Sequence, residues 1–292
     1  MSSYIKQNTL NGIFKISGVG LHTGKFINVT FRPSKEDTGI IFRRIDYKTI
    51  FYIPALFSNV QYCNYSTVLN YKGVSIYTVE HLLFALSVLS IDNIIIDLDG
   101  EEIPILDGSA YPFIKILRDI GITCQNKPRK FIKIKKKIIV NYEDRFVILS
   151  PYNKYKMLVK LDFSYILLNY SENFIETTLE NLLDIVNISK SKTFGFLDDY
   201  GILKKNGLIQ GANIKNVVVF NNKFILNEDI IGSNYSIIKH KILDSFGDMN
   251  LLGKKIIGFY YAYKPGHMLN NMLLNKLMND IDSYEMVLCK EF

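Results

Sequence analysis

The most informative stretch of this 292-residue chain is IIKHKILDSFGDMNLL, residues 237–252. It predicts one strong helix, in which positions i and i+4 lie on the same face. His240, Asp244 and Asp248 therefore form a polar stripe, while the apolar residues between them lie away from it and can be buried. An imidazole and a carboxylate one helical turn apart can bind one zinc ion together. The alternative is a His–Asp pair on a helix surface without a metal, and this stretch alone leaves both interpretations open.

A second helix is predicted from TVEHLLFAL, residues 78–86, where Thr78 can cap the start. Adjacent helix residues point about 100° apart. His81 can therefore bind a metal while Glu80 reaches a water molecule beside it, which adds a third ligand and a general base. A catalytic zinc has three protein ligands and one open position, and it lowers the pKa of its water to about 7. The alternative for Glu80 is an exposed carboxylate favoured by the helix dipole.

The third element with chemical potential is KPGHMLNN, residues 264–271. His267 follows a Pro-Gly turn and precedes a predicted helix, where it can act as a mobile acid or as an electrostatic stabiliser. Taken alone, it could also be an ordinary loop histidine. The chain has only four histidines, and each lies beside a glycine, a carboxylate or a helix start. The fourth is His22.

His22 belongs to a glycine-rich segment, SGVGLHTGK, residues 17–25. A dinucleotide-binding loop must open a helix, because the helix N-terminus holds the pyrophosphate. Here an extended segment follows instead and ends at FRP, residues 31–33. We therefore exclude a nucleotide loop and predict a β-hairpin with a tight glycine connection.

The rest of the chain mixes strands and helices. Strands are predicted at 94–98, 131–140, 217–220 and 256–263, and helices at 113–120, 179–186, 197–208 and 268–278. The elements do not alternate regularly as βαβ units, which favours an α+β fold. The polar QNKPR, residues 125–129, is the best boundary. We predict an N-terminal α+β domain, 1–126, with the helix of Glu80 and His81, and a C-terminal α+β domain, 127–292, with the other two elements.

Composition excludes several classes of protein. The chain is 48% hydrophobic and 22% charged, which is typical of a globular protein with a sizeable core. No apolar run reaches the roughly 18 residues of a membrane span, and the N-terminus lacks the pattern of a signal peptide, so we expect a cytoplasmic protein. Three distant cysteines do not support disulfides or a cysteine-based zinc site. The net charge of +7 is spread along the chain and carries little functional information.

Six blocks along the chain resemble one family, the UDP-3-O-acyl-N-acetylglucosamine deacetylases of lipid A biosynthesis. They are SGVGLHTGK, TVEHLLFAL, EIPILDGSAYPF, SKTFGF, IKHKILDSFGDMNLLG and PGHMLNN, in the order and spacing of that family. Each block is weak alone, but six in order cover nearly the whole chain and are very specific.

The resemblance implies a fold and a metal. The fold is α+β, with two domains of similar topology, each a β-sheet layered with helices, and the active site between them. A segment near 197–222 corresponds to an inserted βαβ unit that forms a tunnel for the fatty acyl chain. The implied cofactor is Zn²⁺, bound by His81, His240 and Asp244.

The resemblance also implies roles for the other candidate residues. Glu80 is the base that activates water, and His267 is a cation that acts as an acid or stabilises the transition state, oriented by Asp248. Thr193 donates a hydrogen bond to the oxyanion. Phe194 contacts the sugar, Lys241 binds near polar groups of the substrate, and His22 lies near the site. Lys192 stands where the family often has arginine, and a lysine lacks the planar fork that makes bidentate contacts.

The expected reaction releases acetate and a free amine from the acylated UDP-sugar, with the leaving amine protonated by Glu80 or His267. A zinc peptidase is a weaker alternative, because the H-E-x-x-H helix of those enzymes is absent. A nucleic-acid binder is suggested only by charge, without a binding motif, so we expect no nucleic-acid partner. We expect a monomer that makes transient contact with the anionic inner membrane surface.

Overall fold

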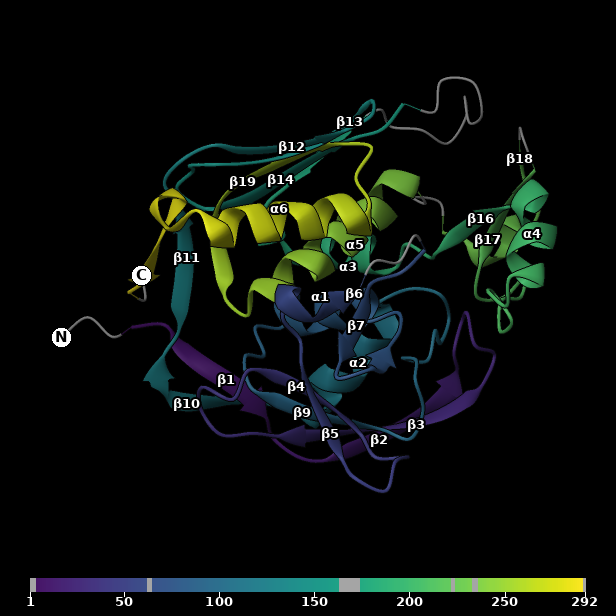
Figure 1. Cartoon of the computed structure of the whole chain (residues 1–292), viewed down its shortest axis with the longest axis horizontal. Coiled ribbons are helices and arrows are strands. Elements are labelled where there is room, and N and C mark those ends of the chain that lie inside the picture. Colours follow the sequence, from purple (N-terminus) through teal and green to yellow (C-terminus); the bar gives the residue numbers. More distant parts are fainter. Residues whose placement is uncertain (1–3, 62–64, 163–173, 222–223, 233–235, 291–292) are drawn as a thin grey trace.

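The computed structural model describes residues 4–61, 65–162, 174–221, 224–232 and 236–290. Two β-sheets form the outer layers, and the main helices lie between them (Figure 1). The short elements β16 to β18 and α4 project from one end of these layers. This arrangement confirms the predicted α+β fold.

The first half of the chain forms a five-stranded sheet. Its order is β2 (Phe14–Val19), β3 (Phe26–Pro33), β9 (Ile94–Leu98), β4 (Ile40–Arg44) and β5 (Phe51–Pro54). All neighbours are antiparallel except β9 and β4, which are parallel. Helix α1 (Glu80–Val88) precedes β9, and α2 (Tyr111–Ile120) follows it.

The second half repeats this path. Its strands lie in the order β12 (Ile138–Tyr142), β13 (Arg145–Ser150), β19 (Lys255–Tyr263), β14 (Tyr155–Lys160) and β15 (Phe174–Thr177), and again only the third and fourth are parallel. Helix α5 (Ile237–Met249) precedes β19, and α6 (His267–Asn279) follows it. The predicted similarity of the two halves is therefore present strand by strand, and α1 corresponds to α5.

Each half carries its own extra elements before the corresponding helix. In the first half these are β6 (Val60–Gln61), β7 (Val68–Tyr71) and β8 (Val74–Ile76). In the second half they are α3 (Leu182–Ser189), β16 (Phe194–Phe196), α4 (Tyr200–Lys205), β17 (Val218–Asn221) and β18 (Phe224–Ile225). β16 and β17 are parallel with α4 between them, so they form a βαβ unit. This unit begins at Phe194, before the predicted segment 197–222, and overlaps most of that segment. Position 222 of that segment lies outside the described residues.

Smaller elements complete the chain. Strand β1 (Lys6–Leu10) pairs with β10 (Ile122–Pro128), and β11 (Lys130–Ile134) lies between β19 and β20 (Tyr284–Leu288). The 3-10 helices are η1 (Phe57–Asn59), η2 (Leu197–Asp199), η3 (Glu228–Ile230), η4 (Asn250–Leu252) and η5 (Ile281–Ser283). The predicted boundary after residue 126 falls inside β10, and the division into two domains there stays a prediction.

Three sequence predictions were wrong in detail. The strand expected at 131–140 is two strands, β11 and β12, because three exposed lysines at 135–137 separate them and cannot alternate into the core. Thr78 does not cap α1, because Val79 occupies the N-cap position. Thr78 instead has a φ of 60° and its hydroxyl donates to Glu102 at 2.9 Å. The helix expected at 197–208 is shorter, since η2 occupies its first turn.

Helices α1 and α5 pack against each other at the centre of the molecule. Residues Glu80 to Ser87 of α1 are all buried, as expected for a helix covered on every side. A Cβ atom added at Gly247 of α5 would lie 2.2 Å from the carbonyl oxygen of Glu80. The two backbones therefore approach so closely that only glycine fits at this crossing.

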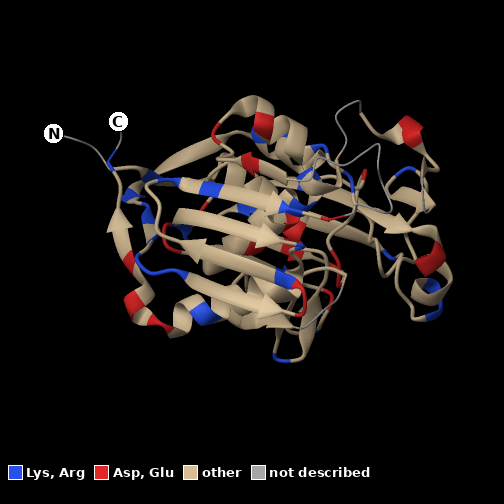
Figure 2. Ribbon diagram, turned by 90° about the horizontal axis from the view of Figure 1, so that it is seen from above, with Lys and Arg blue, Asp and Glu red and all other residues tan. Residues whose placement is uncertain are grey.

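Charged residues are distributed over many elements, with Lys and Arg interspersed among Asp and Glu (Figure 2). Within the described residues, no helix combines the length and the apolar character that crossing a membrane requires.

Candidate metal centre

Three buried side chains converge where the N-terminal parts of α1 and α5 meet. They are His81 from α1 and His240 and Asp244 from α5, and one potential ligand atom of each lies within 4.8 Å of the others. Nε2 of His81 is 3.7 Å from Oδ1 of Asp244, and Nε2 of His240 is 3.4 Å from the same oxygen. Two ligands of one tetrahedral zinc ion are about 3.3–3.6 Å apart, given bond lengths of about 2.0–2.2 Å. The spacing fits a shared metal.

The ionisation of these groups also suits a metal. Burial lowers the pKa of His81 and lowers that of His240 to about 3, so both imidazoles are neutral and can donate a lone pair. Burial alone raises the pKa of Asp244, but His240 and Lys241 outweigh it and hold that pKa well below its usual range. A metal requires this combination of neutral imidazoles and an ionised carboxylate.

Unsatisfied polar atoms provide the test of fit. Oδ1 of Asp244, which both imidazoles face, is buried and has no hydrogen-bond partner among the described residues. Buried polar atoms are almost always paired, so this one calls for a cation. Nδ1 of His240 lies 3.2 Å from the carbonyl oxygen of Ser191, the kind of contact that fixes the tautomer of a metal-binding histidine. The residues present therefore fit a zinc ion.

Glu80 and His267 lie beside the three ligands. Burial raises the pKa of Glu80 to about 8. Burial alone would lower the pKa of His267, but the carboxylates of Asp248 and Glu80 outweigh it and raise it to about 10. Nε2 of His267 is 3.9 Å from Oε1 of Glu80, and its Nδ1 donates to Oδ2 of Asp248 at 2.9 Å. A buried carboxyl group and an imidazole of raised pKa thus face each other at the edge of the candidate metal centre.

Two residues at this site were missed by the sequence analysis. The hydroxyl of Thr67 donates to Oδ1 of Asp248 at 2.5 Å, and the side-chain amide of Asn270 donates to Oδ2 at 2.8 Å. Asn270 follows His267 by three positions on α6, so helical spacing could have placed it on the same face. Thr67 is 181 residues from Asp248, and no local pattern points to it.

Three further predicted residues, Phe194, Lys241 and Thr193, belong to the second half of the chain, and the first two contact the candidate ligands His240 and Asp244. The ring of Phe194 contacts that of His240, with centroids 5.8 Å apart, and Nζ of Lys241 is 5.4 Å from the Phe194 centroid. Lys241 also donates to Oδ2 of Asp244 at 2.9 Å. Thr193, directly before β16, is half-buried, and its backbone N–H donates to Gly108.

His22 lies in the turn between β2 and β3 and is buried, with a pKa lowered by burial. Neither of its ring nitrogens has a hydrogen-bond partner among the described residues. Its carbonyl oxygen accepts from Gln210, which follows α4. The turn of the first half therefore contacts the insert of the second half, with His22 at their junction.

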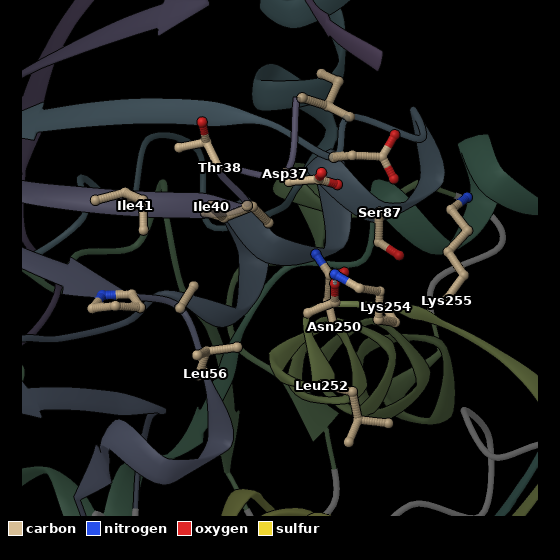
Figure 3. A pocket seen from close by; sticks show the side chains of 16 residues that line it. Asp37, Thr38, Ile40, Ile41, Leu56, Ser87, Asn250, Leu252, Lys254 and Lys255 are labelled. Carbon is tan, nitrogen blue, oxygen red and sulfur yellow. Dashed lines mark hydrogen bonds between the residues drawn. The ribbon is translucent and has the colours of Figure 1, made fainter. Parts of the chain in front are cut away.

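A cavity of about 230 Å³ lies at the opposite ends of α1 and α5 (Figure 3). Ser87 from α1, Asn250 after α5 and Lys255 from β19 contribute to its lining. Burial lowers the pKa of Lys255 to about 8, and its Nζ donates to the hydroxyl of Ser90 at 2.6 Å. No histidine is among the described residues that line this cavity, so it lacks the ligand set of the metal centre.

The chain is similar to known proteins over nearly its whole length. Residues 7–279 match the family described as UDP-3-O-acyl N-acetylglycosamine deacetylase. A protein of Coxiella burnetii (strain CbuK_Q154), named UDP-3-O-acyl-N-acetylglucosamine deacetylase, is 40% identical over 287 residues, which are 98% of this chain and 95% of that protein. Proteins with the same name from Teredinibacter turnerae and Pseudomonas entomophila are 40% and 38% identical over 283 residues, 97% of this chain and 93% of each protein. The similarity includes both halves.

Proposed function

This chain belongs to the UDP-3-O-acyl N-acetylglycosamine deacetylase family, and we propose that it uses zinc to hydrolyse the N-acetyl group of UDP-3-O-acyl-N-acetylglucosamine. The products are acetate and UDP-3-O-acyl-glucosamine, in the committed step of lipid A biosynthesis. The observation that carries this proposal is the convergence of His81, His240 and Asp244 beside a buried carboxylate, Glu80.

The metal has a defined part in this proposal. His81, His240 and Asp244 would hold it, and when bound it would polarise the acetamide carbonyl and make a nucleophile available at neutral pH. The other groups of the reaction belong to the chain itself.

Glu80 is the proposed general base. Its raised pKa makes its carboxylate a stronger proton acceptor than an exposed glutamate, and it can take the proton of the attacking water. His267 remains protonated at neutral pH, so its positive charge can stabilise the negative oxygen that forms during attack. The leaving amine then takes a proton from Glu80 or His267.

We assign substrate contacts to four further residues. Thr193 donates to the oxyanion, and Phe194 contacts the sugar. Lys241 is placed for the polar groups of the substrate, and His22 lies where the acylated sugar enters. The βαβ insert near 197–222 would hold the acyl chain, because its exposed apolar residues include Leu197, Ile202 and Ile214. We further propose a monomer that works in the cytoplasm and touches the anionic membrane surface to reach its acylated substrate.

The decisive experiment pairs metal analysis with an acetate-release assay. The purified chain is expected to hold one zinc per molecule and to release acetate from the acylated UDP-sugar, while a peptide substrate is not cleaved. Glu80→Gln should keep the zinc, and its turnover number should decrease about 10²- to 10⁴-fold. Near-normal turnover of that zinc-loaded variant would show that Glu80 is not the base. Peptide cleavage without sugar deacetylation would overturn the proposed substrate.

Membrane contact has its own test. Co-sedimentation with liposomes should increase with the fraction of anionic lipid and decrease with salt. Binding that is independent of anionic lipid would contradict an electrostatic contact.

A further inference from the structure

The carboxylate of Asp248 accepts hydrogen bonds from two residues besides its ion-pair partner His267. It is 2% exposed, and it accepts from Thr67 on one oxygen and from both His267 and Asn270 on the other. These donors come from two separate segments: Thr67 lies directly before β7, and His267 and Asn270 lie three positions apart at the start of α6. Such a set leaves the carboxylate little freedom to rotate.

The orientation of Asn270 is itself determined. Its side chain is fully buried, and its Oδ1 accepts from the hydroxyl of Tyr260 at 2.7 Å. The reverse amide orientation would place Oδ1 against the carboxylate of Asp248, two acceptors facing each other without a proton. Asn270 therefore always presents its N–H to Asp248.

Thr67 contacts Glu80 as well as the ion pair of Asp248 and His267. Because its hydroxyl proton goes to Asp248, its oxygen can accept from Nδ1 of His267, 3.0 Å away. Its backbone N–H donates to Oε2 of Glu80 at 3.0 Å. One residue of the first half thus touches the proposed base, the proposed cation and the carboxylate that orients the cation.

We propose that Thr67 and Asn270 are positioning residues, which clamp Asp248 so that His267 keeps its proton on Nδ1 and directs Nε2 toward Glu80 and the substrate. This inference rests on the proposed function of His267 and extends it to two buried residues that act through Asp248. We expect Thr67 to contribute more to this positioning than Asn270, because its hydroxyl contacts both Asp248 and His267.

The test compares two substitutions at one position. Thr67→Val has nearly the same shape and keeps the backbone N–H to Glu80, but it lacks the hydroxyl. Thr67→Ser keeps the hydroxyl. In zinc-loaded protein, Thr67→Val should lower kcat by about 10- to 100-fold with KM nearly unchanged, while Thr67→Ser should stay within about 3-fold of the unsubstituted chain.

A double-mutant cycle separates positioning from general damage. In a His267→Ala background, adding Thr67→Val should change kcat by less than about 2-fold, because the group that Thr67 positions is gone. An equal loss in both backgrounds would overturn the proposal, and so would a Thr67→Ser variant as impaired as Thr67→Val. Asn270→Ala should likewise lower kcat only when His267 is present. Tyr260→Phe should lower kcat less than Asn270→Ala does.

A measurement without turnover keeps the inference distinct from the proposed function. The chain has four histidines, so ¹⁵N-labelled imidazole signals can be assigned by comparison with His267→Ala. His267 should carry protons on both ring nitrogens at pH 7 in the unsubstituted chain and in Thr67→Ser, and it should lose the fixed Nδ1 proton signal in Thr67→Val. Unchanged signals in Thr67→Val would overturn the clamp even if the enzyme is active. If the unsubstituted chain released no acetate while these signals behaved as expected, only the proposed function would fail.

Discussion

The two ends of the α1–α5 pair each bury an ionisable group with a pKa of about 8. At the N-terminal end it is Glu80, whose pKa is raised by burial, and at the far end it is Lys255, whose pKa is lowered by burial. Both groups would be selected by a search for perturbed pKa values. Only the first has neighbours that could take part in a reaction.

The difference lies in what surrounds each group. Around Glu80, an unpaired carboxylate oxygen of Asp244 faces two neutral imidazoles, and His267 supplies a positive charge. Around Lys255, the hydroxyl of Ser90 accepts one hydrogen bond, and the nearby Asp92 is already paired with Arg129. A shifted pKa therefore reports burial at both ends, and the convergence of ligand atoms distinguishes the candidate site.

The largest expected effect is the loss of the metal. Asp244→Ala removes the oxygen that faces both imidazoles, so we expect loss of zinc and a decrease in turnover of at least about 10³-fold, measured by metal analysis and acetate release. Lys255→Met, at the far end, should keep both. Full zinc content in Asp244→Ala would mean that these three residues are not the ligand set.

A smaller effect is expected where the two helices cross. Gly247→Ala places a methyl group against the backbone of Glu80, so the helices must separate. We expect a loss of about 1–3 kcal/mol in the free energy of unfolding, together with weaker zinc binding because His81 moves away from Asp244. Denaturant unfolding and zinc titration measure the two quantities. Ser245→Ala, two positions earlier on the same helix, serves as the control for substitution within α5.

The smallest expected effect is a change in the free energy of unfolding when the buried charge of Lys255 is removed, and this change depends on pH. Burial disfavours charged Lys255, so below pH 8 the folded protein carries a cost that the unfolded chain does not. Lys255→Met should therefore raise the free energy of unfolding by about 1–2 kcal/mol at pH 7, the full shift being reduced by partial access of water.

The sign of the pH dependence follows from the same shift. Between pH 8 and the ordinary lysine pKa of 10.5, the unfolded chain binds more protons than the folded one, so the unsubstituted protein gains stability as pH rises. The advantage of Lys255→Met should shrink across this window. An advantage that is constant from pH 7 to pH 10 would indicate better packing and not the removal of a buried charge.

Much of the candidate site could be predicted because its residues recur at helical spacing. His240, Asp244 and Asp248 share one face of α5 by the geometry of any α-helix, and their three-dimensional proximity needs no tertiary contact. Helical geometry likewise predicts that the adjacent residues Glu80 and His81 point about 100° apart, so one can bind a metal while the other faces a water molecule. The α+β fold followed from irregular alternation, and the family from six ordered blocks.

Errors occurred where a local preference competed with packing. Thr78 is a favourable cap by composition, yet its hydroxyl donates to Glu102, which also accepts from the backbone of His22. The lysines at 135–137 interrupt the apolar alternation and divide β11 from β12. The bond of Thr78 is not visible in a short window, because Glu102 lies 24 positions away in the chain.

The sequence by itself determined which chemical groups are present and which of them share a helix face. Only the tertiary structure decided that α1 and α5 cross at Gly247, which brings His81 to 3.7 Å from Asp244, and that Thr67 reaches Asp248 across 181 positions. The physical reason is that helical periodicity is a local property of the backbone, whereas the approach of two helices depends on the packing of both β-sheets around them.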